Sequence, residues 1–465
     1  MPEYKTPGTY IEEIPKLPPS IASVETAIPA FIGYTQTARL KEDNDLFLKP
    51  HRITSMLDYE QYFGLAMPEV SIEVSFNLAN PSKIDVQGKI NPATASKFLM
   101  YYSLQLFFAN GGGPCYITSV GSYTSTGGII MNVDLQKGLD EVARIDEVTL
   151  ILFPDGLNIA TAGNYYALYK ETLDQCAKLK DRFAVMDVWI DSDITVDNVQ
   201  VLRDFDFGTI DTVKYGAVYY PRLYTRLDYY YTDETAVKIN GVGGAASLAA
   251  LKSVNNAYYF MAKNAITTID LLLPASSGVA GQYATVDKTR GVWKAPANVV
   301  IDLAVRPEKI ITDKEQAGLS IDTSSGKSIN IVRSFPGRGP AIIWGARTLA
   351  GNDNEWRYIP VRRFFNMVEE STGNATKQFV FEPNDRNTWL RVKSMIENYL
   401  ILQWKAGALM GASAKDAFFV HVGLGETMTD LDIQEGRMIV EIGMAIVRPA
   451  EFIILRFMHK MLADS

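Results

Sequence analysis

The hydrophobic positions of the chain follow two patterns, one typical of buried strands and one typical of amphipathic helices. In the central part of the chain, segments of the two kinds alternate. Residues 148–153 (VTLILF), 183–188 (FAVMDV) and 215–220 (YGAVYY) are short runs that are apolar on both faces. Between these runs, residues 162–181 and about 195–206 carry apolar side chains at helical spacing. Apolar strands that alternate with amphipathic helices are typical of a parallel sheet covered on both faces. The pattern therefore predicts an α/β domain at the centre of the chain.

The segments that flank this centre carry other signals. Asn91 and Pro92 form a helix-start signal, and the predicted helix runs to Phe108. Residues 38–90 alternate polar turns with short strands, and residues 225–270 look like an insertion. Residues 273–298 contain mostly small side chains, which predicts a loop.

The last sixth of the chain predicts a long helix over residues 384–410 and a terminal strand. The helix carries a polar stripe in which Arg391, Asn398 and Lys405 recur every seven residues. The strand, residues 452–458, is apolar on both faces, so it must be buried on both sides and hydrogen-bonded along its edges. Chain termini are usually polar and frayed. An apolar terminal strand therefore indicates that a neighbouring subunit receives it.

The other end of the chain points the same way. Residues 9–14 (TYIEEI) form a short strand candidate, and six of the 21 prolines fall within the first 29 residues. Proline at this density excludes helix and favours a stiff, extended arm.

Composition limits the classes of protein to consider. A chain of 465 residues with 47% hydrophobic and 21% charged residues predicts two to four well-cored domains. The net charge of -8 argues against a nucleic acid or an anionic membrane as partner. The two cysteines, Cys115 and Cys176, are too few for a disulfide framework, which predicts buried thiols. There is no signal peptide and no run long enough to span a bilayer, so we expect synthesis and folding in a cytoplasm.

Four aspartates follow the carboxyl ends of predicted strands, where α/β enzymes bind their ligands. They are Asp155, Asp187, Asp191 and Asp193. The three histidines, at positions 51, 421 and 459, lie outside this section, and no nucleotide-binding or hydrolase motif is present. Helix capping and turn formation are therefore favoured over catalysis. The sequence predicts no catalytic, cofactor or metal site. A hydrolase or nucleotide-binding enzyme built on this section stays open as the alternative.

Several long segments resemble contractile tail sheath proteins, a family that includes phage sheaths, R-type tailocins and extracellular contractile injection systems. The segments are KTPGTYIEEI, SIASVETAIPAFIGYT, LPASSGVAGQYATVDKTRGVWKAPAN, SFPGRGPAIIWGARTL, EWRYIPVRR and the C-terminal block. The resemblance is weakest at residues 38–90 and 225–265, where family members carry variable insertions. The length of the chain favours an extracellular injection system over a phage, and both remain open.

The resemblance implies a fold with extended arms at both ends. The middle domain would be α/β, doubly wound and subtilisin-like without the catalytic triad, and the C-terminal domain α+β. The implied domains are an N-terminal extended arm (1–29), an outer, variable segment (30–90), a middle domain (91–345) with an insertion at about 225–270, and a C-terminal inner domain (346–465) ending in an exchanged strand (451–461).

The resemblance also implies residues for inter-subunit strand exchange. In the two arms these are Thr9, Tyr10, Ile11, Ile14, Phe452, Ile453, Ile454, Leu455 and Phe457. The acceptor would be the sheet formed by residues 418–422 and 437–447 of a neighbouring subunit. The polar stripe of Arg391, Asn398 and Lys405 is a candidate surface for attachment to an inner tube.

The implied function is that of a structural sheath subunit with no enzymatic activity and no cofactor. Hexameric rings of the chain would stack around an inner tube protein, with baseplate and terminal cap proteins at the ends and no nucleic acid or membrane insertion. The extended sheath would be metastable and would contract to drive the tube through a target envelope. The particle would assemble in the cytoplasm and then be released or stay associated with an envelope.

Overall fold

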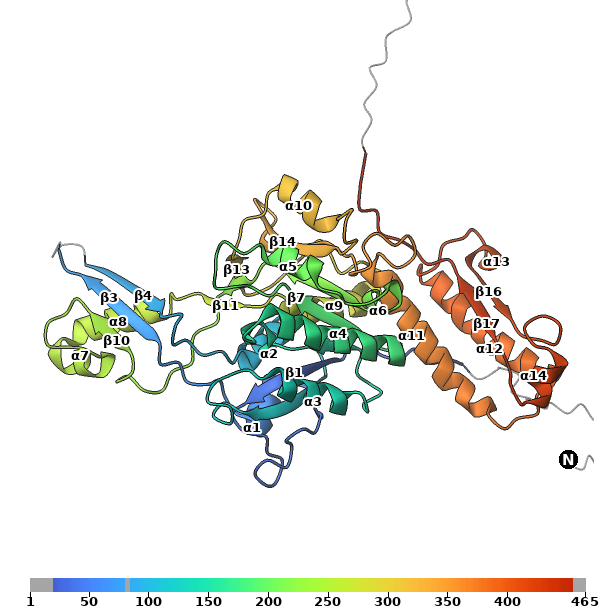
Figure 1. Ribbon diagram of the computed structural model, residues 1–465, viewed down its shortest axis with the longest axis horizontal. Coiled ribbons are helices and arrows are strands. Elements are labelled where there is room, and N and C mark those ends of the chain that lie inside the picture. Colours follow the sequence, from blue (N-terminus) through green and yellow to red (C-terminus); the bar gives the residue numbers. More distant parts are fainter. Residues whose placement is uncertain (1–19, 80–83, 455–465) are drawn as a thin grey trace, which may run out of the picture. The chain divides into compact units, whose positions relative to one another are not determined.

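The computed structural model describes residues 20–79 and 84–454, which divide between two compact units (Figure 1). Of the described residues, the larger unit, here called the body unit, comprises 25–79, 84–367 and 448–454. The smaller, here called the terminal unit, comprises residues 20–24 and 368–447. One helix, α11 (Ile359–Thr376), begins in the body unit and ends in the terminal unit. Each unit is described by itself below.

The body unit is built on one nine-stranded sheet. Its strands are β1 (Pro29–Thr35), β2 (His51–Ile53), β5 (Cys115–Ser122), β6 (Leu150–Leu152), β7 (Phe183–Asp187), β8 (Gly216–Tyr220), β12 (Val299–Val300), β14 (Ile329–Phe335) and β15 (Gly339–Trp344). Their order is β12-β15-β14-β8-β7-β6-β1-β5-β2. The six strands from β14 to β5 run parallel, and β15 and β2 pair antiparallel with the outermost of these six. The three strands predicted at the centre of the chain are confirmed as β6, β7 and β8.

Helices cover both faces of this sheet, and side chains alternate between two cores as the strand period requires. In β7, Phe183 and Val185 point into one core, whereas Ala184 and Met186 point into the other. The first core is closed by α1 (Met56–Phe63), α2 (Met100–Ala109) and α9 (Ser276–Arg290), and the second by α3 (Asn132–Val142), α4 (Ala162–Leu179) and α5 (Asn198–Asp204). The prediction of a mixed α/β fold is confirmed, and Cys115 and Cys176 are buried thiols as predicted.

Further elements of the body unit are η1 (Gly156–Asn158), α6 (Ile210–Val213), α10 (Asp313–Ser320) and a three-stranded sheet of β9 (Leu223–Thr225), β11 (Leu271–Leu273) and β13 (Ala304–Pro307). Several of them add buried residues to these cores, such as Leu319 of α10 in one and Leu223 of β9 in the other. No helix in the described part of the chain is long and apolar enough to cross a membrane.

Two segments far apart in the sequence form a separate core within the body unit. Its elements are β3 (Ile72–Asn77), β4 (Asp85–Ile90), β10 (Lys238–Asn240), α7 (Leu248–Val254) and α8 (Asn256–Ile266). β10 pairs in parallel with β3, and Val74, Ile239 and Leu251 are buried together. The predicted outer segment thus divides: β1, β2 and α1 belong to the central sheet and its cover, while β3 and β4 join the predicted insertion.

The predicted helix from Pro92 to Phe108 is too long at its start. Asn91 caps a turn, since Ala93 N–H donates to its side-chain oxygen at 3.1 Å, and its own N–H donates to Ser71 O at 2.9 Å. The helix α2 begins at Met100 instead. There, the N–H groups of Leu99 and Met100 donate to the Asp155 carboxylate, a distant residue that sequence spacing does not reveal.

The predicted loop over residues 273–298 is also wrong, because it contains the 15-residue helix α9. Glycine and serine lower helix propensity, but their small size lets α9 approach α2 closely. A Cβ atom on Gly281 would lie 2.5 Å from Phe107 O of α2. Helix α1, likewise, lies within a stretch that was predicted to hold only turns and strands.

The terminal unit is a helix pair against a two-stranded sheet. After α11 come η2 (Lys377–Phe379), α12 (Arg386–Lys405), α13 (Ala414–Ala417), β16 (Phe418–His421), α14 (Asp430–Gln434) and β17 (Glu441–Met444). The predicted long helix after Pro383 is confirmed as α12, whose first turn is capped by Asp385 accepting from Thr388 N–H at 2.9 Å. Val392, Ile396 and Leu400 form part of its buried face.

We expect Gly281→Val to destabilise the body unit by about 1–3 kcal/mol, because the added atoms meet rigid backbone of α2. Gly163→Ala is the matched control. Gly163 lies in α4, and a Cβ atom added there would meet no other atom within 4 Å, so alanine should be neutral or slightly stabilising. Thermal or urea unfolding measures both changes, and equal effects of the two variants would contradict the close packing of α9 on α2.

Candidate functional site

The sheet of the terminal unit is unusually small. β16 and β17 pair antiparallel, with Phe418 opposite Met444 and His421 opposite Glu441. Because this sheet has only two strands in the described part of the chain, β16 and β17 each have an outer edge with no neighbouring strand, although an isolated bridge joins Ile446, just beyond β17, to Leu409. A two-stranded sheet is marginally stable in water, and open edges are templates for pairing with another chain. The predicted role of this sheet as a strand acceptor stays a prediction.

A groove of about 860 Å³ lies beside β17. One wall consists of Gly436, Met438, Val440 and Ile442, of which Ile442 lies within β17 and the other three precede it. The remaining lining residues come from α11, α12 and the connection between these helices. Two of these lining residues, Val380 and Phe381, expose their apolar side chains. The groove is thus a mixed apolar and polar channel along the sheet.

The predicted arm residues are only partly within the described chain. Thr9, Tyr10, Ile11, Ile14, Leu455 and Phe457 lie outside it. Phe452, Ile453 and Ile454 are described; they form no strand within the chain, and their exposed fractions are 69%, 80% and 79%. Three consecutive large apolar side chains are therefore mostly uncovered by the described part of the chain. Their role in strand exchange stays a prediction.

The predicted polar stripe lies on one exposed side of α12. Arg391, Asn398 and Lys405 are all exposed. Arg391 forms an ion pair with Glu382 at 3.7 Å, and its guanidinium lies over the ring of Phe379. Exposed single ion pairs contribute little to stability. The stripe is thus accessible to a partner, and its contact with an inner tube stays a prediction.

Asp155 is a helix cap rather than a catalytic carboxylate. It is fully buried and accepts three backbone hydrogen bonds, from Tyr34 at 2.8 Å, Leu99 at 2.6 Å and Met100 at 3.1 Å. These bonds join β1 and the start of α2 to the end of β6. Burial raises the pKa of Asp155 to about 6, although the three N–H donors act in the opposite direction. A Cβ on Gly33 would lie 2.5 Å from this carboxylate, which explains the glycine there.

Asp187 plays the same part for α9. Its carboxylate accepts from Ala275 N–H at 2.9 Å and Ser276 N–H at 3.1 Å, and burial raises its pKa to about 6. Asp191 and Asp193 instead close local turns, accepting from the N–H groups of Asp193 and Thr195. The interpretation of these aspartates as caps and turn residues is confirmed.

The two histidines in the described part of the chain, His51 and His421, offer these aspartates no base, and His459 lies outside that part. His51 lies on the edge strand β2 against Tyr62, and His421 contacts Phe419 and Glu426 in the terminal unit. Within residues 20–79 and 84–454, no group of three or more His, Cys, Asp or Glu side chains could hold a metal ion.

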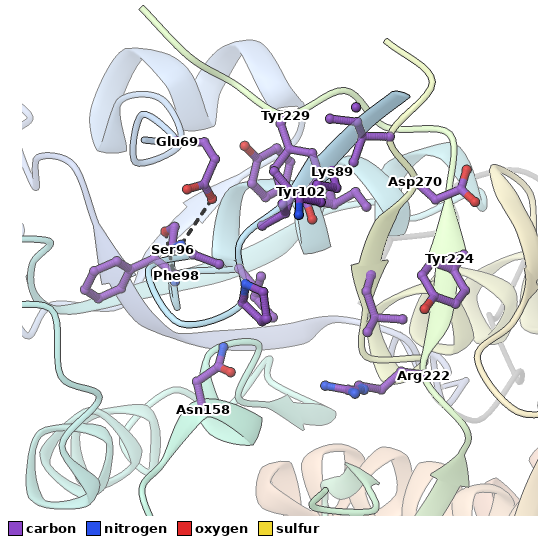
Figure 2. A pocket seen from close by; sticks show the side chains of 18 of the residues that line it. Glu69, Lys89, Ser96, Phe98, Tyr102, Asn158, Arg222, Tyr224, Tyr229 and Asp270 are labelled. Carbon is purple, nitrogen blue, oxygen red and sulfur yellow. Dashed lines mark hydrogen bonds between the residues drawn. The ribbon is translucent and has the colours of Figure 1, made fainter. Parts of the chain in front are cut away.

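The body unit has one further hollow, of about 590 Å³, shown in Figure 2. The charged side chains Arg222, Arg306 and Glu69 that line it already have partners. Arg222 pairs with Glu308 at 2.5 Å, Arg306 lies 3.5 Å from Asp270, and Glu69 accepts from Ser96 N–H at 3.1 Å. With these groups already paired, the hollow presents no convergent set of free polar groups for a ligand.

Comparison with known proteins gives matches throughout the chain. Residues 351–459 match the family described as the phage tail sheath C-terminal domain. The curated tail sheath proteins of Vibrio phage KVP40 and Enterobacteria phage T4 are 29% and 27% identical over 128 residues. That segment covers 28% of this chain and 19% of each phage protein, so the chain matches about a fifth of the length of these relatives.

Solved structures extend the likeness to the whole chain. The helical sheath of the anti-feeding prophage (AFP) in its contracted state is 32% identical, with a TM-score of 0.65, over 98% of this chain and 100% of that one. The chain belongs to the contractile tail sheath family. The contracted sheath complex of PVC, an extracellular contractile injection system, is 30% identical over 99% of each chain, with a TM-score of 0.65.

Membership of the sheath family decides between the two functional classes. The relatives are structural sheath proteins, and the alternative of a hydrolase or nucleotide-binding enzyme is not supported. The sheath fold retains the strand ends at which enzymes bind ligands, but here these ends hold helix caps. Shared architecture does not carry shared chemistry.

Sequence reasoning missed two buried arginines of this sheath protein. Arg347 binds Glu451, and Arg363 binds Asp287 and the backbone of Thr26, so each arginine contacts the chain close to one of the arms. The signal that could have found them was the density of arginines at 347, 357, 362 and 363 between two buried segments. Buried arginine is rare unless it is paired, so such a cluster predicts internal ion pairs.

The raised pKa of Asp155 predicts a pH-dependent stability. Its pKa of about 6 in the folded state exceeds the ordinary value of 3.8. The contribution of this group to the free energy of unfolding is therefore complete below about pH 4 and is lost as the pH rises through about 6. Asp155→Asn removes this titration, so wild type should lose its advantage over the variant between pH 4 and pH 7.

Asp193→Asn is the matched control with the opposite sign. Hydrogen bonds from Thr195 lower the pKa of Asp193. Its contribution is therefore present above the ordinary pKa and lost as the pH falls, so the advantage of wild type should grow with pH. Urea unfolding of the three proteins at a series of pH values measures both trends; parallel trends for the two variants would contradict the assignment.

Proposed function

We propose that the chain is a sheath subunit whose six-fold rings stack around an inner tube protein, with baseplate and terminal cap proteins at the ends. The observation that carries this proposal is the likeness over nearly the whole chain to the contracted helical sheath of the anti-feeding prophage. Its likeness to a chain of the AFP baseplate structure, at 30% identity, supports an association with a baseplate.

We further propose that neighbouring subunits exchange strands. The N-terminal segment around Thr9–Ile14 and the C-terminal segment around Phe452–Phe457 would add strands to the β16–β17 sheet of neighbours. The two open edges of that sheet and the exposed apolar side chains of residues 452–454 support this. Strand addition supplies main-chain hydrogen bonds and side-chain pockets. Each large apolar side chain that becomes buried contributes about 1.5–3 kcal/mol.

Contraction would then need no nucleotide, because its free energy is stored at assembly. The extended sheath would be a metastable state held by contacts with the tube and the baseplate. On contraction, the body units would exchange weak contacts for larger interfaces, while the exchanged strands keep subunits connected. The tube would be driven through a target envelope by this movement.

Three finer assignments belong to the same proposal. The middle domain, residues 91–345, would be doubly wound and subtilisin-like, which the run of parallel strands with helices on both faces supports. The C-terminal domain, residues 346–465, would face the tube. Assembly would take place in the cytoplasm, before release as part of an extracellular contractile particle.

Electron microscopy of the purified full chain, with and without its inner tube, tests the proposal directly. We expect tubular polymers with a helical repeat. Small closed oligomers under all conditions, or single subunits that never polymerise, would overturn the sheath assignment.

Removing either arm should prevent polymerisation and leave the fold intact. The two variants lack residues 1–20 or residues 452–465, which lie in the predicted exchange segments. A conservative control, Phe452→Leu with Ile454→Val, keeps the arm apolar and should still assemble. Sedimentation and microscopy measure assembly, and circular dichroism checks the fold. Tubes of normal length from either truncated chain would exclude strand exchange as the link between subunits.

The stripe on α12 should matter for attachment to the tube. Arg391→Glu with Lys405→Glu reverses two exposed charges, which typically changes stability by less than about 0.5 kcal/mol. We expect tube-templated assembly to weaken. The control Arg386→Glu with Lys415→Glu makes the same change in net charge at exposed positions outside the stripe. If both pairs reduce tube-bound sheath equally in a co-sedimentation assay, net charge and not the stripe is responsible.

A further inference from the structure

The C-terminal arm is fixed to the body unit just before its apolar residues begin. The chain leaves β17 in the terminal unit, but the described residues after it, 448–454, belong to the body unit. Arg448 donates from Nη1 to Asn354 O at 2.7 Å, and three residues later Glu451 binds Arg347. The root of the arm is thus held against the segment that connects β15 to α11.

The contact between Arg347 and Glu451 is bidentate. The Arg347 Nε donates to Oε1 and Oε2 of Glu451 at 2.9 and 3.1 Å, and its Nη2 donates to Oε2 at 2.6 Å. The Tyr358 hydroxyl donates to Oε2 at 3.2 Å. The Arg347 side chain is only 5% exposed and that of Glu451 25%. Paired, charge-assisted hydrogen bonds of this kind are strong and define one geometry.

Arg347 is itself held by the central sheet. Its backbone N–H donates to Oδ1 of Asn330 at 2.8 Å, and Nδ2 of Asn330 donates to Arg347 O at 2.8 Å and to Val218 O at 3.1 Å. Asn330 lies on β14 and Val218 on β8, and both are buried. Nη1 of Arg347 also donates to Gly351 O at 3.1 Å. The guanidinium therefore has a fixed position relative to the sheet.

Residues 452–454 follow this contact directly, and all three are exposed. A free arm of this composition would gain stability by folding back onto apolar surface of its own subunit. A rigid contact at its root restricts the directions that the arm can take. The arm would then remain available for a second copy of the chain.

We propose that the Arg347–Glu451 pair is a positioning clamp that sets the direction of the C-terminal arm for insertion into a neighbouring subunit. This inference rests on the proposed function as a strand-exchanging sheath subunit. It assigns to Arg347, and to Glu451 at the start of the predicted exchanged strand, a role in selecting exchange between subunits over back-folding.

The other arm begins from a contact of the same kind. Arg363 binds the two carboxylate oxygens of Asp287 at 3.0 and 2.5 Å and donates to Thr26 O at 2.7 Å. The Thr26 hydroxyl donates to Asp287 at 2.6 Å. The side chains of Arg363 and Asp287 are 3% and 7% exposed. The chain thus passes a buried arginine–carboxylate pair of the body unit close to each of its two arms.

The test compares assembly of Glu451→Gln with that of wild type in the full chain. The amide cannot accept the charged, bidentate bonds, so we expect a folded subunit whose critical concentration for polymerisation rises about tenfold, equivalent to ~1.4 kcal/mol. Glu355→Gln makes the same chemical change at an exposed position of the same connecting segment. This control should polymerise like wild type.

A second variant separates arm direction from stability. Glu451→Gln leaves the buried Arg347 without its partner, which lowers stability by itself. Arg347→Met with Glu451→Gln removes the buried charge, so the melting temperature should return toward wild type while assembly stays impaired. If assembly recovers together with the melting temperature, the pair only stabilises the fold and the clamp is refuted.

The remaining outcomes distinguish the clamp from the proposed function. Polymerisation of Glu451→Gln at the wild-type concentration refutes the clamp and leaves the sheath assignment intact. Failure of wild type itself to polymerise, with or without a tube, overturns both.

Discussion

A parallel sheet must bury both of its faces, and the architecture of the body unit follows from this constraint. Two of the helices that cover one face, α2 and α9, start at the carboxyl ends of β6 and β7. The first N–H groups of a helix have no partner within it, and burying them unpaired would cost about 1–3 kcal/mol each. Asp155 and Asp187 supply these partners. Each therefore connects the end of a central strand to the start of a covering helix.

The same arrangement explains why the fold suggests an enzyme and yet belongs to a structural family. Ligands of α/β proteins bind at the carboxyl ends of parallel strands, where helix N-termini offer N–H groups to anions. In this chain the anion is part of the protein, because Asp155 accepts the N–H groups of Leu99 and Met100 and Asp187 those of Ala275 and Ser276. The raised pKa values that often mark catalytic carboxylates here arise from burial of a structural cap.

The parts of the fold that could be predicted are those whose signals are local. β6, β7 and β8 were predictable because strands buried on both faces are continuously apolar, and α12 because its buried face repeats at helical spacing. The start of α2 and the whole of α9 were not, since both depend on carboxylates from distant strands and on close packing around Gly281. The exposed stripe on α12 could be predicted because its polar residues recur every seven positions. The ion pair between Arg347 and Glu451 could not, because no local pattern connects two residues so far apart in the sequence.

The sheets of the two units differ in how fully the single chain covers and pairs them. The body unit closes its sheet between two layers of helices, whereas the terminal unit has a sheet of two strands, in the described part of the chain, with both outer edges open. Independent stability usually requires three or more strands with an apolar face. An added strand would extend this sheet, and residues 452–454 expose apolar side chains suited to one. Since these residues are rooted on the body unit through Glu451, strand addition by a second copy would link the body of one subunit to the terminal unit of another. Under the proposed strand exchange, the sheet that is least complete in the single chain would be the one that connects neighbouring subunits.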